Sequence, residues 1–124
     1  MISLQIVIYI IIVHWIADFV LQTDKMAKGK SSNLEDLLSH TIVYSGFIGL
    51  ASCFFLSPYK HGFLEPSLFM TITFFCHTIT DYFTSRLNSN LWSKGKTHYF
   101  FVSVGFDQIL HYAQLFITYY LLTR

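Results

Sequence analysis

Long apolar stretches separated by short polar segments are the dominant pattern along the chain. A helix needs roughly 20 mostly apolar residues to cross a bilayer. Four stretches meet this requirement if a few polar residues are tolerated, at about 2–22, 35–57, 67–88 and 99–122. Because short connections make sequential helices antiparallel neighbours, the pattern predicts an all-α, multi-pass membrane protein. We expect a single domain, an up-down bundle of four transmembrane helices.

Composition and charge support this class of protein. The chain of 124 residues is 53% hydrophobic and only 12% charged, which is about half the charge content of an average soluble domain. Its formal net charge is +1, and it has no basic stripe of the kind found on nucleic-acid-binding proteins. We therefore expect the lipid bilayer as a partner and expect no nucleic acid.

Basic residues in the connections predict the orientation in the membrane. Lys60 and Arg124 fall on one side of the predicted bundle. Six basic residues fall on the other side, namely Lys25, Lys28, Lys30, Arg86, Lys94 and Lys96. Since Lys and Arg concentrate on the cytoplasmic side of membrane proteins, we expect a protein of the inner (cytoplasmic) membrane with both termini on the non-cytoplasmic side.

Each predicted helix carries one aspartate and one histidine four residues apart. The pairs are His14/Asp18, Asp36/His40, His77/Asp81 and Asp107/His111. Four-residue spacing places both side chains on one helix face, about 5–6 Å apart. The order within the pairs alternates along the chain, and helix direction alternates in an up-down bundle. We therefore expect the four histidines at one depth and the four aspartates at another, nearer the cytoplasm.

Ionisable groups inside a membrane span cost several kcal/mol and usually mark a functional site. Neighbouring carboxylates repel one another unless they are protonated or neutralised by a cation. Imidazole and carboxylate ligands suit a divalent transition metal, so we predict one or two ions, Zn²⁺ first, with Fe or Mn as alternatives. The predicted ligands are His14, Asp18, His40, His77, Asp81, Asp107 and His111. Of these, Asp18, Asp81 and Asp107 are also the candidate catalytic residues, as ligands or as a general base.

Further polar residues lie on or near this polar stripe, namely Gln22, Asp36, Ser85, Arg86 and Gln108. We expect them to contact substrate or to orient the ligands, while polar packing between helices is the competing interpretation. Arg86 has the chemistry to hold a phosphate or to anchor its helix at the interface. Asp36 falls in the first turn of its helix, where an acidic residue is stabilising without any other role.

Four segments resemble one known family: HWIADFVLQTDKMAKGK, LLSHTIVYS, HTITDYFTSRLNSNLW and HYFFVSVGFDQILHYAQLF. They are similar to the DUF3307 family of small bacterial and phage membrane proteins of unknown function, over nearly the whole chain. The family's motifs map to His14, Asp18, Gln22, His40, His77, Asp81, Asp107, Gln108 and His111. Asp36 is outside these motifs. The resemblance implies no activity, but a looser likeness to membrane-bound metal-dependent hydrolases with HxxxD motifs suggests one by analogy.

The leading hypothesis is a metal-dependent membrane hydrolase that acts on a lipid or lipid-linked ester or phosphoester from the cytoplasmic side. A metal-bound water would be the nucleophile. One alternative is a carrier or channel for protons or divalent metals that uses the same residues as a relay, for which so small a chain would have to form a homo-oligomer. Another is a non-catalytic factor that binds a membrane protein. The outer halves of the spans, such as IVIYIII and LFMTITFF, are nearly free of polar residues, which favours a closed pocket over a conduit.

Overall fold

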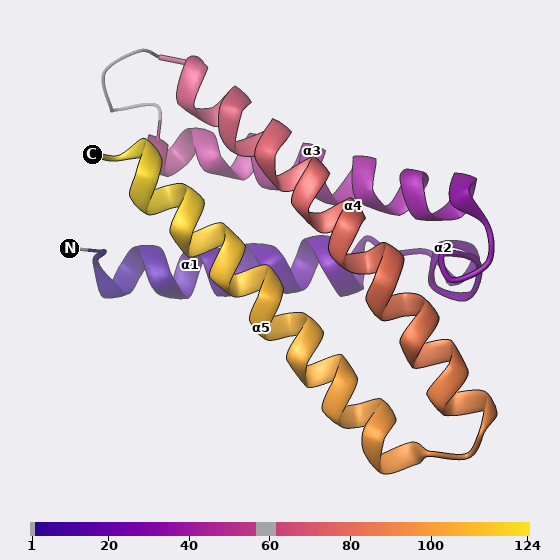
Figure 1. The fold of residues 1–124 in the computed structure, drawn as a ribbon. Helices are drawn as coiled ribbons and strands as arrows, with labels where there is room; N and C mark the ends of the chain where they lie inside the picture. The colour runs from indigo at the N-terminus through magenta and orange to yellow at the C-terminus, as the bar shows by residue number, and fades with distance from the viewer. Residues whose placement is uncertain (1, 57–61) are drawn as a thin grey trace.

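The computed structural model describes residues 2–56 and 62–124, and these are helical almost throughout (Figure 1). The elements are α1 (Leu4–Trp15), η1 (Ile16–Val20), α2 (Asp24–Gly29), α3 (Leu34–Leu56), α4 (Leu64–Ser93) and α5 (Thr97–Leu122). The prediction of an all-α chain is confirmed. The four predicted stretches correspond to α1 with η1, and to α3, α4 and α5, although α4 begins and ends several residues beyond its predicted bounds. Lys60 lies outside the described residues.

Local sequence signals explain where these helices begin and end. The side chain of Ser3 accepts a hydrogen bond from the Ile6 N–H, and that of Thr23 accepts one from the Met26 N–H, so both cap helix N-termini. Gly95 has φ of 67°, in the left-handed region that glycine adopts without strain. It allows a turn of three residues, 94–96, to join α4 to α5.

The helices form two antiparallel pairs that cross obliquely (Figure 1). In the view shown, α1 and α3 run in opposite directions, as do α4 and α5, and the second pair passes across the first. The end of the second pair that carries the α4–α5 turn therefore points away from α1 and α3. Both termini lie at the opposite end of the molecule from α2. Sequential long helices are antiparallel, as expected.

Two of the described helices, α3 and α5, are long and apolar enough to cross a membrane, as judged by length and composition. Half of the tested window of α3 is buried inside the molecule, against 17% for α5. The apolar segment Leu4–Val20, which combines α1 and η1, is shorter. These observations agree with a membrane location, while the arrangement of four spans stays a prediction.

The interior holds the ionisable motif residues and the exterior holds large apolar side chains. His14, His40, His77, Asp81 and His111 are each at most 2% exposed. Outward-facing side chains with more than half of their surface exposed include Leu50, Phe54, Phe83 and Ile109. An apolar core also exists, toward the end where the termini lie, and it includes Ile10, Val13, Ile48, Phe69, Leu115 and Tyr119.

Candidate metal centre

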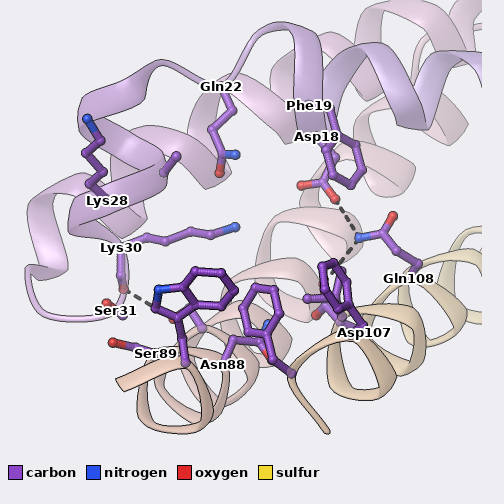
Figure 2. Close-up of a pocket in the computed structure, with 16 residues that line it drawn as sticks. Asp18, Phe19, Gln22, Lys28, Lys30, Ser31, Asn88, Ser89, Asp107 and Gln108 are labelled. Atoms are coloured by element: carbon purple, nitrogen blue, oxygen red, sulfur yellow. Dashed lines mark hydrogen bonds between the residues drawn. The ribbon is translucent and has the colours of Figure 1, made fainter. Parts of the chain in front are cut away.

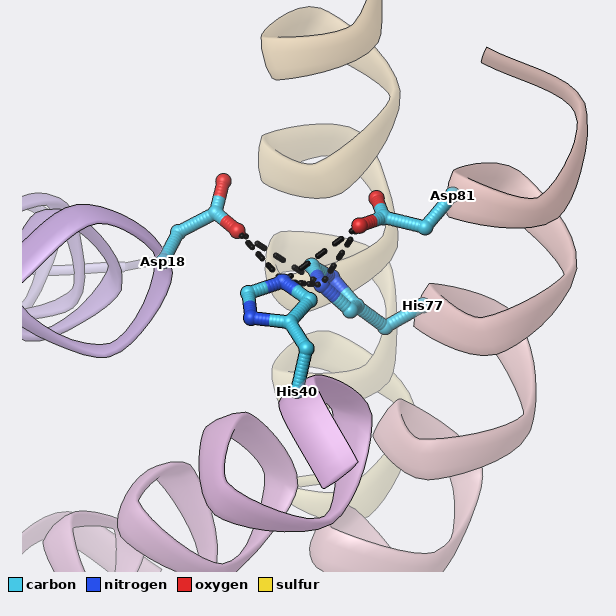
Figure 3. A group of neighbouring side chains, drawn as sticks. All are labelled: Asp18, His40, His77 and Asp81. Atoms are coloured by element: carbon cyan, nitrogen blue, oxygen red, sulfur yellow. Dashed lines mark hydrogen bonds and ion pairs between the residues drawn. The ribbon is translucent and has the colours of Figure 1, made fainter. Parts of the chain in front are cut away.

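Four buried side chains from three elements converge in the interior (Figure 3). Asp18 comes from η1, His40 from α3, and His77 and Asp81 from α4. One ligand atom of each lies within 4.8 Å of the corresponding atom of every other. Imidazoles and carboxylates that are far apart in the sequence thus meet in one place, and this group has the composition of a metal site.

Five of the six distances among the four atoms are close to those of tetrahedral coordination. His40 Nε2 lies 3.2 Å from Asp18 Oδ1 and 3.3 Å from Asp81 Oδ2. His77 Nε2 lies 3.6 Å from each of these two oxygens, and the two Nε2 atoms are 3.1 Å apart. Ligand atoms about 2.0–2.1 Å from a tetrahedral Zn²⁺ are separated from one another by about 3.3–3.4 Å. The group could therefore hold Zn²⁺ with little rearrangement.

The π-helical segment η1 sets the position of Asp18. Its wider turn begins at Ile16, between His14 and Asp18, and only one oxygen of Asp18 faces His14. Oδ2 of Asp18 lies 3.7 Å from His14 Nε2, whereas Oδ1 faces His40 and His77. Short π-helical segments inside α-helices are frequent at functional sites.

A second buried group shares Asp81 with the first. It consists of Asp81, Asp107 and His111. His111 Nε2 lies 3.1 Å from Asp81 Oδ1 and 3.3 Å from Asp107 Oδ1. Thr84 Oγ1 donates a hydrogen bond of 2.7 Å to the same Asp107 oxygen. The two oxygens of Asp81 thus face different groups, with Oδ2 toward the first and Oδ1 toward the second.

A chain of hydrogen bonds holds the remaining carboxylate oxygens. Gln108 Nε2 donates to Asp18 Oδ2 at 3.1 Å and to Asp107 Oδ2 at 3.2 Å. Gln108 Oε1, which can only accept, lies 2.7 Å from His14 Nε2. His14 must therefore donate from Nε2 and accept with Nδ1 from the Tyr44 hydroxyl, also at 2.7 Å. Both nitrogens of His14 are engaged, and the structure places this predicted ligand outside both groups.

One carboxylate oxygen of the first group has no hydrogen bond. Asp18 Oδ1 is buried and accepts no well-aligned hydrogen bond among the described residues, although His40 Nε2 lies 3.2 Å away; Oδ2 of the same residue is held by Gln108. A buried acceptor without a partner is costly. A metal ion bound to Oδ1 would remove that cost, because the atom points at the space between His40 and His77 (Figure 3).

Lys30 is the cation closest to these carboxylates. Its Nζ donates a hydrogen bond of 2.9 Å to Asp81 Oδ2. Burial alone would lower the pKa of Lys30, but attraction by Asp81 and Asp18 outweighs it and raises that pKa above its usual value. Lys30 therefore carries one positive charge against three negative charges, those of Asp18, Asp81 and Asp107. Either protons on the imidazoles or a bound divalent cation would balance the remaining negative charge.

A cavity of about 530 Å³ adjoins the two groups at the end of the molecule near α2 (Figure 2). Asp18, Asp107 and Gln108 contribute to its wall, which places the candidate metal centre against open space. At the other end, the apolar core encloses a space of only about 10 Å³, lined by Ile10, Val13, Ile48, Phe55, Phe69 and Leu115. Among the described residues, the site thus faces a cavity on the α2 side and packed apolar side chains on the other.

The other predicted residues divide between the cavity and separate contacts. Gln22 and Ser85 line the cavity. Arg86 donates to the Tyr82 carbonyl and packs 3.7 Å above the Tyr82 ring, so its guanidinium is turned away from the site. Asp36 is buried but accepts from Asn33 Nδ2 at 3.2 Å and lies 3.5 Å from Lys25 Nζ. Asp36 therefore fastens the start of α3 and belongs to neither group.

Sequence reasoning missed three residues that support the site. Tyr44 stacks on His77, with ring centroids 3.7 Å apart, and its position four residues after His40 is a signal that extends the polar stripe. Thr84 follows Asp81 by three residues and therefore shares its helix face. Lys30 was counted only as evidence of orientation, and no local pattern indicates that its side chain turns inward.

Fold and site together define an all-helical chain with buried His/Asp groups that could hold a metal ion. Residues 6–124 match the profile of the family described as "Protein of unknown function (DUF3307)". The chain belongs to this family, as its motifs predicted. No curated protein and no solved structure matches it.

Proposed function

We propose that this chain is an integral membrane protein that binds one divalent metal ion, Zn²⁺ first, through Asp18, His40, His77 and Asp81. We further propose that it uses this ion to hydrolyse a lipid or lipid-linked ester or phosphoester. One observation carries the proposal: four buried ligand atoms lie within 4.8 Å of one another, and one of them, Asp18 Oδ1, accepts no hydrogen bond among the described residues.

The distribution of exposed residues supports a membrane setting for the long helices. Phe54, Leu50 and Phe83 are 81%, 72% and 67% exposed, while the ionisable motif residues are buried. Soluble monomers rarely expose contiguous apolar patches larger than a few hundred Å². Lipid is the surrounding in which an apolar exterior and a polar, satisfied interior are both favourable.

The hydrogen bond between His77 and His111 favours one bound metal ion rather than two. His77 Nδ1 and His111 Nδ1 are 3.2 Å apart, so one of these nitrogens donates to the other. If His77 binds the metal through Nε2, its Nδ1 carries the proton and His111 accepts with Nδ1. A neutral His111 then carries its own proton on Nε2, donates it to Asp81 Oδ1, and has no lone pair left for a second ion. His111 thereby orients His77 and Asp81, as outer partners of metal ligands commonly do.

A metal ion in this position would lower the pKa of a bound water and polarise the scissile group. Four protein ligands fill a tetrahedral shell, so the water would have to bind as a fifth ligand or take the place of one carboxylate. The cavity beside Asp18 is the side from which this water would approach. Asp107 lies on the cavity wall outside the set of four ligands. Its Oδ1 accepts from Thr84, and Asp107 is the carboxylate best placed to act as general base.

A carrier of protons or divalent metals is the second candidate, and a specific observation favours it. His40, His77 and His111 form a continuous series in which ring nitrogens lie 3.1 and 3.2 Å apart. Such a series can pass a proton. A carrier also needs a path to both sides of the membrane, and the packed apolar side chains beyond His14 (Ile10, Val13 and Leu115) oppose one in a single copy of the chain.

Elemental analysis of detergent-purified protein tests the metal centre. We expect one Zn²⁺ per chain in the wild type after reconstitution without chelators, and loss of the ion in His77→Ala and in Asp18→Ala. His98→Ala is the matched control, because His98 is exposed near the start of α5, away from both groups. Wild-type protein without bound metal, or His77→Ala with its metal retained, would contradict the proposal.

Hydrolysis is tested on the same preparations. We expect Asp107→Asn to keep its metal, because Asp107 is not among the four proposed ligands. We also expect this variant to lose most of its hydrolysis of phospholipid substrates, measured as released product. Proton or metal flux into protein-containing liposomes, without any hydrolysis, would instead support the carrier.

A further inference from the structure

The cavity beside the metal centre contains a positively charged side chain with unused hydrogen-bond donors. In Figure 2 the Lys30 side chain extends into the cavity, while Lys28 lies at its edge. An ammonium group has three N–H donors, and Asp81 Oδ2 is the one acceptor that the described residues provide for Lys30. Two donors remain. The N–H donors of an ammonium group suit an anion.

The polar wall next to Lys30 carries buried acceptors without partners. Gln22 Oε1 and Asn88 Oδ1 are both buried and without a hydrogen bond among the residues that the structure describes, and both residues line the cavity. These two oxygens are closed off from the open space, so a ligand reaches them only when the two amides turn toward the cavity. A carbonyl oxygen can only accept, so such a ligand must bring hydroxyl or N–H groups of its own. Ser31 and Ser89 also line the cavity and can either donate or accept.

Aromatic side chains also line the cavity and continue to the apolar exterior. Phe19, Trp92, Phe100 and Phe101 line it, and the rings of Trp92 and Phe100 lie 5.0 Å apart. Trp92 is 60% exposed and Phe101 is 63% exposed, so these side chains reach both the cavity and the outer surface. A ligand with its head in the cavity could therefore extend an apolar chain along them into surrounding lipid.

We infer that this cavity binds an anionic phospholipid whose phosphate contacts Lys30 and whose head-group alcohol carries free hydroxyls for Gln22 and Asn88. This inference rests on the proposed function and narrows its substrate class. The phosphate would then lie next to Asp81 and the metal centre, which is the position that phosphoester hydrolysis requires. A zwitterionic choline head group would bring no hydroxyl donor and would place a second cation near Lys30.

Fluorescence quenching in lipid nanodiscs tests this inference, because Trp92 lines the cavity and the chain has only two tryptophans. Trp15→Phe leaves Trp92 as the single reporter. Phosphatidylglycerol with brominated acyl chains is compared with equally brominated phosphatidylcholine, each diluted into unlabelled phosphatidylcholine. We expect stronger quenching by the phosphatidylglycerol at equal mole fraction in the zinc-loaded protein.

Matched variants test whether Lys30 causes the preference for phosphatidylglycerol. Lys30→Gln should reduce the phosphatidylglycerol preference about tenfold, which is the effect of losing one charge-assisted hydrogen bond. Lys25→Gln, an exposed lysine of α2 that faces Asp36 and does not line the cavity, should leave it unchanged. Asn88→Leu should lower the preference for phosphatidylglycerol over phosphatidic acid, which lacks the glycerol hydroxyls.

Equal quenching by the two lipids in the wild type would overturn the inference, as would an equal loss in Lys25→Gln and Lys30→Gln. Displacement of the brominated lipid by inorganic phosphate would show that the site binds a water-soluble anion instead. Zinc content is measured on every preparation. A zinc-loaded protein without lipid preference contradicts only this inference, whereas a protein without zinc contradicts the proposed function.

Discussion

At the scale of single residues, Gln108 connects the two buried groups. Its amide nitrogen holds Asp18 and Asp107 through their Oδ2 atoms, and its carbonyl oxygen is fixed by His14. The Oδ1 atoms of both carboxylates are thereby turned toward the histidines. A flexible carboxylate would lose rotational freedom on binding a metal, so a partner that fixes its orientation beforehand raises metal affinity.

Replacing this amide should weaken metal binding more than it weakens the fold. We expect Gln108→Leu to lower Zn²⁺ affinity by roughly 10–100-fold, the usual effect of losing an outer partner of the ligands. Competition with a chelator of known affinity measures the change. Gln114→Leu is the control, because Gln114 is an amide on the same helix that donates to Thr73 and Thr118 instead of to a carboxylate. Equal losses of affinity in the two variants would contradict the role given to Gln108.

Residue types and spacing were enough to predict most of the candidate site. The four-residue His/Asp pattern identified Asp18, His40, His77 and Asp81, which converge, and Asp107 and His111, which adjoin them. Spacing did not show which members of the four pairs belong to the buried groups and which lie outside them. His14 and Asp36 fit the pattern equally well, yet His14 is held by Tyr44 and Gln108, and Asp36 by Asn33. Hydrogen bonds from other helices made this difference, and a repeat within one helix carries no information about them.

At the scale of elements, two short segments distinguish the structure from a plain bundle of helices. The π-helical η1 turns Asp18 toward His40, and the apolar sequence IADFV gives no sign of it. The six-residue α2 brings the chain back so that Lys30 reaches Asp81. Long apolar helices could be predicted because lipid or core burial fixes their composition. These two segments depend on contacts with α3 and α4, which only the folded chain supplies.

Gly29, the last residue of α2, should tolerate no side chain. A Cβ there would lie 2.6 Å from Asp36 Cγ and closer still to one of its oxygens. We expect Gly29→Ala to lower the free energy of unfolding by about 1–3 kcal/mol, as overpacking usually does, measured by denaturant unfolding in detergent. If this contact is the cause, the double variant Gly29→Ala, Asp36→Gly should be no less stable than Asp36→Gly alone, because glycine also removes the Asp36 Cβ that would lie 2.8 Å away. Additive losses would place the cause elsewhere.

At the scale of the whole molecule, polar and apolar residues are arranged the opposite way from a soluble bundle. The aspartates and histidines of both groups are buried, while Leu50, Phe54 and many other large apolar side chains face outward. The basic connections Lys25–Lys30 and Lys94–Lys96 follow the proposed cytoplasmic ends of their helices. The cavity lies at that same end, so its ligand would arrive from the cytoplasmic leaflet.

Cysteine labelling in intact cells tests this orientation. In a background with Cys53 and Cys76 replaced by serine, we expect Arg124→Cys to react with a membrane-impermeant maleimide from outside. Ser32→Cys and Ser93→Cys, both at exposed positions in or beside the basic connections, should react only after the membrane is permeabilised. Reaction of Ser32→Cys and Ser93→Cys from opposite sides would rule out an even number of crossings between them.

Because Asp81 contacts both groups, few other residue types could replace it. One of its oxygens serves His40, His77 and Lys30, and the other serves His111. Asparagine would present an amide N–H₂ to one of these neighbours, where an acceptor is needed, and glutamate would push its carboxylate a methylene further into a filled space. A substitution at Asp81 therefore disturbs both groups at once, whereas each other member belongs to one group and can be changed without touching the other.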